Sequence, residues 1–197
     1  PVFDAIHRLP LRLAAEGALD GLRVDHVDGL RDPAEYAERL RAAAGDDTWI
    51  VVEKILRPNE ELPTSWPIDG TTGYEVADVL GAWLTDPAGA ERLTDVWRKA
   101  VDEHRTFPEV AAETRRMVLT TSLTADVERL TDAMVRVCEG RRRHRDHARE
   151  ALRAALVEVA SHAPSYRSYV RFVDGDPQRP VAAPADEQFV RTAVDAA

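Results

Sequence analysis

The stretch Gly21-Leu22-Arg23-Val24-Asp25-His26-Val27-Asp28-Gly29 decides the fold when it is read together with Trp49-Ile50-Val51-Val52-Glu53. Each stretch has the composition of a short β-strand, and each ends in a carboxylate. The residues between them have the length and pattern of one helix, so the whole reads as a strand–helix–strand unit. A right-handed crossover makes two such strands parallel and often adjacent, and catalytic side chains of parallel α/β sheets gather at the carboxyl ends of the strands.

Alternation of side chains sharpens this prediction. Arg23 and Asp25 share one face of the first strand, and Glu53 shares a face of the second strand with Val51. Because adjacent strands lie roughly 4.8 Å apart, carboxylates at equal height should be on the order of 5 Å apart. That separation is typical of retaining glycosidases, whereas inverting enzymes need roughly 6.5–9.5 Å.

Composition limits the class of protein. The chain has 197 residues, a hydrophobic content of 44% and a formal net charge of −9. The acidic balance argues against a general nucleic-acid binder, and no apolar run approaches the length of a membrane span. A single cysteine, Cys138, permits no internal disulfide, which suits a reducing, cytoplasmic location. The chain opens at Pro1 without an initiator Met, so we expect it to be an internal fragment of a longer protein.

Two parts are expected along the chain. Residues 1–73 have the pattern of a parallel α/β segment, and the Pro- and Gly-rich residues 54–73 read as a long loop beside the strand ends. Residues 74–197 have mainly helical patterns, and Trp83 and Trp97 fall on apolar helix stripes that predict core positions. Residues 166–173 are expected to be extended, ending at a turn over 174–177.

A family resemblance enters through these same motifs. Residues 21–30 resemble the second conserved region of the α-amylase-type glycoside hydrolases (glycoside hydrolase family 13), in the form found in maltooligosyltrehalose synthases. Residues 50–56 resemble the third region of that family, and similar motifs follow at 60–63, 66–67 and 70–74. Tyr166-Arg167-Ser168-Tyr169 resembles part of its helical insertion. The resemblance is strong over 20–75 and loose beyond, and it implies part of a (β/α)8 TIM-type barrel followed by a mainly helical insertion.

The resemblance also implies roles for residues near the strand ends. Asp25 would be the nucleophile and Glu53 the general acid/base, while Arg23 would hold Asp25 ionised and oriented. His26 and Asp28 would lie near the sugars, and Lys54 is a further candidate for substrate binding. Trp66 and Tyr74 are aromatic residues that could stack on sugar rings; the alternative for them is packing beneath the loop.

The reaction that the resemblance implies is an intramolecular transglucosylation in trehalose biosynthesis. A (1→4)-α-D-glucan 1-α-D-glucosylmutase, which is an isomerase, converts the reducing-end α-1,4 bond of a maltooligosaccharide to an α,α-1,1 bond. It needs neither cofactor nor metal. The family's third catalytic Asp would lie beyond residue 197, and the rest of the parent barrel would be its structural partner. We therefore expect this chain to be inactive alone.

Several alternatives stay open from the residues alone. Asp25 and Glu53 could be ordinary strand-end carboxylates, or they could join His26 and Asp28 in a metal site, although alternation turns His26 away from Asp25 while the strand continues. The parent could be another α-amylase-type hydrolase or transglucosylase, or the chain could be a non-catalytic helical interaction module. The basic run 141–145 could bind an acidic partner, but it fits an exposed helix junction better.

Overall fold

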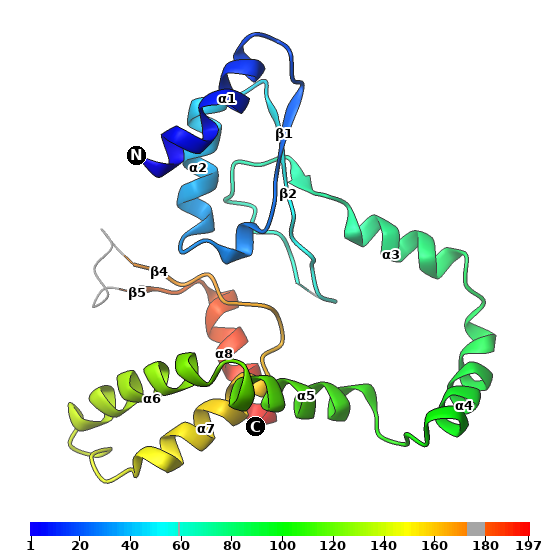
Figure 1. Cartoon of the computed structure of the whole chain (residues 1–197), viewed down its shortest axis with the longest axis vertical. Helices are drawn as coiled ribbons and strands as arrows, with labels where there is room; N and C mark the ends of the chain where they lie inside the picture. Colours follow the sequence, from blue (N-terminus) through cyan, green and yellow to red (C-terminus); the bar gives the residue numbers. More distant parts are fainter. Residues whose placement is uncertain (59, 173–179) are drawn as a thin grey trace. The chain divides into compact units, whose positions relative to one another are not determined.

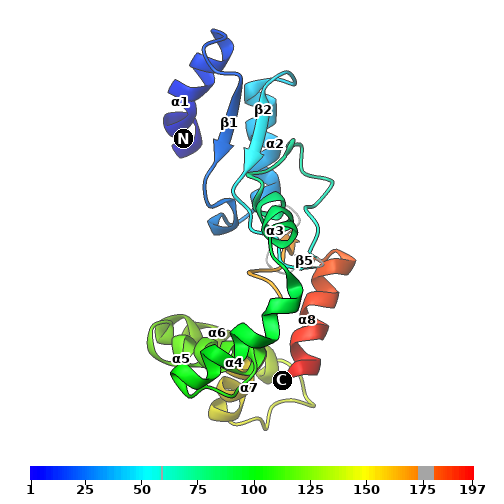
Figure 2. The same cartoon turned by 90° about the vertical axis from the view of Figure 1, so that its right-hand side faces the viewer.

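The computed structural model describes residues 1–58, 60–172 and 180–197, which form two compact units (Figures 1 and 2). Unit 1 contains residues 1–87 and 165–181, and unit 2 contains residues 88–164 and 182–197. The division therefore differs from the expected one after residue 73, because helix α3 and the returning segment 165–181 both belong to unit 1. The turn expected over 174–177 lies outside the described residues.

In the described residues of unit 1, a small parallel sheet is combined with the helices α1, α2 and α3. Its elements in chain order are α1 (Val2–Ala15), β1 (Gly21–Val24), the 3₁₀ turn η1 (Val27–Gly29), α2 (Pro33–Ala44), β2 (Trp49–Val52), β3 (Gly70–Thr71), α3 (Tyr74–Trp83), β4 (Arg171–Phe172) and β5 (Pro180–Val181). The short strands β4 and β5 pair antiparallel with each other, apart from the parallel sheet.

The parallel sheet has the strand order β1-β2-β3. The predicted parallel pairing of the two long strands is confirmed, with Gly21 opposite Trp49 and Val24 opposite Val52. Strand β3 lies beside β2 within residues 54–73, for which the sequence predicts only a loop. The α/β character of this part is confirmed. The three described strands do not close into a barrel, so the barrel remains a proposal.

Helix α2 begins and ends where its sequence signals lie. The Asp32 carboxylate accepts a hydrogen bond from the Glu35 amide at 2.9 Å, and Pro33 is the first helical residue. Gly45 ends the helix with a φ of 85°, a conformation that favours glycine. One side of α2 packs against α1, where the Tyr36 hydroxyl lies 2.7 Å from His7 Nε2.

Unit 2 is helical. The turn η2 (Pro87–Gly89) leads into it, and its helices are α4 (Ala90–Val101), α5 (Phe107–Thr121), α6 (Thr124–Glu139), α7 (Arg149–Ser161) and α8 (Pro184–Ala196). Helices α5, α6 and α7 contact one another, and α8 packs against α7 (Figure 1). Val127, Leu152 and Val157 are buried between them. A bidentate ion pair joins Arg116 on α5 to Glu158 on α7, with nitrogen–oxygen distances of 2.9 and 2.6 Å.

The core positions predicted for two tryptophans are wrong. Trp83 on α3 is 82% exposed and Trp97 on α4 is 49% exposed. Their helices carry the expected apolar stripes, but no residue of either helix is buried within the part of the chain that the structure describes. A periodic stripe indicates which face a helix would bury, and it does not supply the surface that covers that face.

Candidate active site

Asp25 and Glu53 leave neighbouring strands at the same height. Val24 is paired with Val52, and the Glu53 amide donates a hydrogen bond to the Val24 carbonyl at 2.7 Å. The residue after each strand therefore stands directly beside its neighbour, as the alternation of side chains predicted. The sheet thus presents two carboxylates at one edge.

One guanidinium group contacts both carboxylates. Arg23 Nη1 donates to Asp25 Oδ1 at 2.7 Å, and Arg23 Nη2 lies 3.6 Å from Glu53 Oε1. The hydrogen bond from Arg23 is the main reason that the pKa of the Asp25 carboxyl lies below its ordinary value of 3.8. Glu53 adds a smaller contribution in the same direction, which indicates that the two carboxyl groups are close. Arg23 therefore has the contacts expected of a residue that keeps Asp25 ionised.

His26 ends the first strand and turns the chain. Its backbone is in the left-handed region (φ 46°, ψ 48°), so alternation no longer directs its side chain. The His26 amide donates to Glu53 Oε2 at 2.9 Å. Its ring lies over Gly29, where a Cβ would come within 2.9 Å of the ring, so only glycine fits there without a shift. The ring edge of His26 lies 3.4 Å from the Tyr166 hydroxyl.

Asp28 and Lys54 belong to a buried ion-paired group. The Lys54 side chain is 1% exposed, and its Nζ lies 2.6 Å from Glu60 Oε1 and 3.4 Å from Asp28 Oδ2. The Tyr169 hydroxyl donates to Asp28 Oδ1. Both candidate sugar-binding groups are therefore occupied by protein partners. Asp28 and Lys54 are near Asp25 and Glu53 in the sequence, but their side chains are not exposed at the surface.

The two aromatic candidates have different surroundings. Trp66 is 5% exposed and belongs to the core with Val27 and Val52, its ring meeting the Tyr169 ring edge-on at 5.2 Å. For Trp66 the structure shows the alternative, packing beneath the loop. Tyr74 is 41% exposed at the start of α3 and is close enough to Arg23 to interact with it electrostatically. Tyr74 is therefore the aromatic candidate that stays exposed near Arg23.

The returning segment contributes residues that had no expected role. Arg167 donates hydrogen bonds to the backbone carbonyls of Asp28, within the turn η1, and of Leu30 and Arg31, which follow it. Tyr166 stands edge-on to the His26 ring at 6.2 Å. The Tyr-Arg-Ser-Tyr motif was the available signal, since aromatic rings around an arginine often form stacking contacts. Sequence spacing gave no indication that it would meet a turn about 140 residues earlier.

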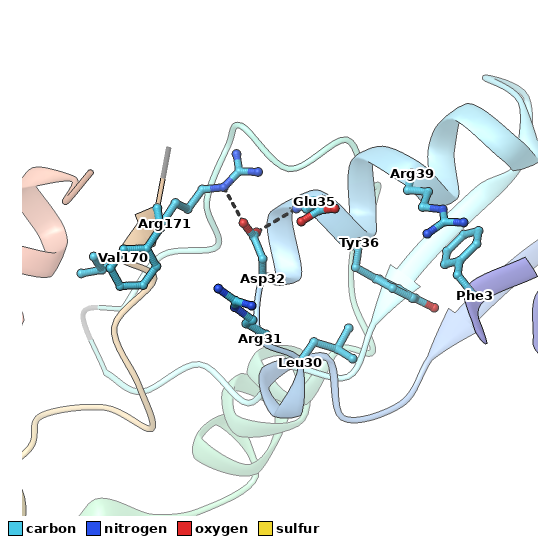
Figure 3. Close-up of a pocket in the computed structure, with 10 residues that line it drawn as sticks. Phe3, Leu30, Arg31, Asp32, Glu35, Tyr36, Arg39, Val170 and Arg171 are labelled. Carbon is cyan, nitrogen blue, oxygen red and sulfur yellow. Dashed lines mark hydrogen bonds and ion pairs between the residues drawn. The ribbon is translucent and has the colours of Figure 1, made fainter. Parts of the chain in front are cut away.

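A separate pocket of about 400 Å³ lies beside α2 (Figure 3). It is lined by residues of α1, the start of α2 and the segment around β4. Asp32 accepts a hydrogen bond from Arg171 Nε at 2.9 Å, and the Arg39 guanidinium stacks over the Phe3 ring at 4.1 Å. Asp25 and Glu53 are not among its lining residues, so this pocket is distinct from the edge that carries the acids.

The described ranges, residues 1–58, 60–172 and 180–197, bear on metal and membrane binding as follows. No cluster of three or more His, Cys, Asp or Glu side chains there has a geometry that could hold a metal ion. None of the helices in that part is both long and apolar enough to span a membrane. The basic residues 141–145 form an exposed connection between α6 and α7.

A titration tests the coupling between Arg23 and Asp25. In Arg23→Met we expect the pKa of Asp25 to rise toward 3.8, measured by carboxyl ¹³C NMR. Because the folded pKa is lowered, the stabilisation from this pair is present above about pH 4 and is lost as pH falls through the folded pKa. The matched control is Arg39→Met, which should raise the pKa of Asp4 instead. An unchanged Asp25 titration in Arg23→Met would refute the coupling.

These features define an α/β unit with paired strand-end carboxylates that share one arginine. No family model matches the chain. The relatives found by comparison with known proteins share one enzyme name. Two relatives from Mycobacterium tuberculosis (strains CDC 1551 / Oshkosh and H37Rv), provisionally named maltooligosyl trehalose synthase, are each 38% identical over 166 residues, which cover 84% of this chain and 21% of the relative.

Solved structures agree with this result. The maltooligosyltrehalose synthase of Arthrobacter ramosus matches with a TM-score of 0.73 and 36% identity, over 98% of this chain and 24% of that one. A hypothetical maltooligosyl trehalose synthase of Sulfolobus tokodaii matches with a TM-score of 0.65 and 28% identity, over 88% of this chain and 20% of that one. The resemblance inferred from the sequence is confirmed, and the chain spans about a fifth of the length of the relatives it matches.

Proposed function

We propose that this chain is the acid-bearing segment of a maltooligosyl trehalose synthase of the α-amylase type. The observation that carries the proposal is the pair Asp25 and Glu53 at adjacent strand ends, with Arg23 in contact with both. The likeness to the Arthrobacter ramosus enzyme over 98% of the chain supports it. The remaining strands of a (β/α)8 barrel, and the third acid, would come from the rest of the parent protein.

The proposed reaction uses the two acids in turn. Asp25 attacks the anomeric carbon of the glucosyl unit next to the reducing-end glucose, while Glu53 protonates the departing glycosidic oxygen. A covalent β-glucosyl–Asp25 ester results. The released glucose is retained and turned so that Glu53 removes the proton of its anomeric hydroxyl, whose oxygen then displaces Asp25. Two inversions restore the α configuration at the donor carbon, and attack by the α-anomer of the retained glucose supplies the second α of the new α,α-1,1 bond.

The residues around the acids suit this sequence of steps. Arg23 favours the ionised form of Asp25, which is the form that attacks. The His26 amide holds Glu53 Oε2 at 2.9 Å and thereby restricts where that carboxyl can point. Tyr74, which interacts with Arg23, and Tyr166, which meets the His26 ring edge-on, are exposed aromatic rings on which a sugar ring can stack.

Product analysis with maltopentaose tests the proposal. The full-length parent protein should convert maltopentaose to a non-reducing product that ends in trehalose, detected by chromatography and loss of reducing ends. This chain by itself should show no turnover under the same conditions, because only part of the pocket is present. Release of glucose without trehalose ends would favour another α-amylase-type enzyme instead. Clear trehalose formation by the isolated chain would refute its proposed status as one segment of the catalytic pocket.

A further inference from the structure

We propose that Asp28, Lys54, Glu60 and Tyr169, here called the Lys54 network, position the two acids instead of contacting sugar. This inference rests on the proposed function for its catalytic consequence. The network is defined by contacts of one buried ammonium group: Lys54 Nζ meets Glu60 Oε1 at 2.6 Å and Asp28 Oδ2 at 3.4 Å, and it lies 5.2 Å from the centre of the Tyr169 ring.

Burial separates the network from any sugar at the strand ends. The side chains of Lys54, Asp28 and Glu60 are 1%, 10% and 16% exposed, whereas that of Asp25 is 74% exposed. The cost of removing the Lys54 ammonium from water is offset only by its two carboxylate partners. An ammonium group paired in this way is not available to bind a ligand. The network therefore acts through the protein.

The network is connected to both acids through the chain, because its members Asp28 and Lys54 lie close to Asp25 and Glu53 in sequence. Asp28 lies in the turn η1, three residues after Asp25, and Lys54 follows Glu53 directly. The ion pair between Asp28 and Lys54 thus ties the two strand ends together just beyond the carboxylates. The His26 amide, between Asp25 and Asp28, also holds Glu53. A shift of η1 would therefore change the position of both acids.

Two further segments meet at the same point. Glu60 Oε2 accepts a hydrogen bond from the Arg57 amide at 3.0 Å, which closes the first part of the loop that follows Glu53. Tyr169 brings in the returning segment through its hydrogen bond to Asp28 and its contact with Trp66. Burial and the Asp28 hydrogen bond raise the pKa of the Tyr169 hydroxyl, so it stays protonated as a donor. The network thus joins η1, the loop and the returning segment.

Kinetics of Tyr169→Phe in the full-length parent test this positioning role. The substitution keeps the ring packed against Trp66 and removes only the hydroxyl that donates to Asp28. We expect kcat to fall about tenfold with KM changed less than about twofold, because misplaced acids slow the chemical step without removing a sugar contact. The matched control is Tyr36→Phe, which removes a half-buried hydroxyl that contacts His7 instead of Asp28 and should leave both constants unchanged. A raised KM with normal kcat would overturn the proposal.

Hydrogen exchange on the chain itself separates this inference from the proposed function. The amides of Gly29 and Leu30 are hydrogen-bonded within η1. Their exchange should become about tenfold faster in Tyr169→Phe and stay unchanged in Tyr36→Phe. Equal exchange in both variants would refute the network. If the parent forms no trehalose ends although exchange behaves as expected, the proposed function fails and the structural role of the network stands.

Discussion

Asp25→Asn in the full-length parent protein is expected to lower the rate of trehalose formation by at least about 10⁴-fold. The amide is nearly the same size as the carboxylate but cannot form the glucosyl ester, so the covalent route is lost. Arg23 keeps its contact with Glu53, and the strand pairing does not depend on the Asp25 side chain. KM should therefore change little, since the sugar-binding surface is kept. The measurement is the initial rate of non-reducing product from maltopentaose.

The control for this prediction is Asp47→Asn, which alters an exposed acid just before strand β2, at the opposite end of the sheet from Glu53. It has the same change of charge and should keep the full rate. Unchanged activity in Asp25→Asn would remove the enzyme interpretation of this edge and favour a helical interaction module. A parallel loss in both variants would point to a general effect of charge on the fold.

The positions of the two acids could be predicted because their determinants are local. A strand period of two places Arg23 and Asp25 on one face, and a single helix between two strands makes them parallel. Register follows from these constraints, since a slip of one residue would turn the buried Ile50 and Val52 toward solvent. The start of α2 at Asp32 and Pro33 could also be predicted, because its capping signals are local in the sequence.

The surroundings of the acids could not be predicted because their contacts are distant in sequence. Asp28 and Tyr169 are 141 residues apart along the chain, and Arg167 meets Asp28 across 139 residues. From the sequence alone, Lys54 looks like an exposed residue that could bind sugar. The Lys54 side chain can be buried because Asp28 and Glu60 neutralise its charge. Strand β3 is two residues long, too short for alternation to distinguish it from a loop.

Replacement of Lys54 gives the largest expected effect on stability. Lys54→Met removes the cation that Asp28 and Glu60 share and leaves two carboxylates in a mostly buried site. Breaking one side of a buried ion pair costs on the order of 3 kcal/mol, because the remaining charge is neither hydrated nor paired. We expect the free energy of unfolding of unit 1, taken from hydrogen exchange of the β2 amides, to fall by about that amount. The methylene part of methionine still fills the space, so the loss reports the charge.

The chain supplies its own control, because its other lysine, Lys99, lies exposed in the last turn of α4 in unit 2. Lys99→Met should change stability by less than about 0.5 kcal/mol, as expected of a surface substitution. A second variant, Glu60→Gln, keeps an acceptor for the Lys54 ammonium but removes one negative charge, so its loss should be smaller than that of Lys54→Met. If Lys54→Met were as stable as Lys99→Met, the ammonium would not be the group that joins η1 to the loop. In that case strand pairing alone would determine the positions of Asp25 and Glu53.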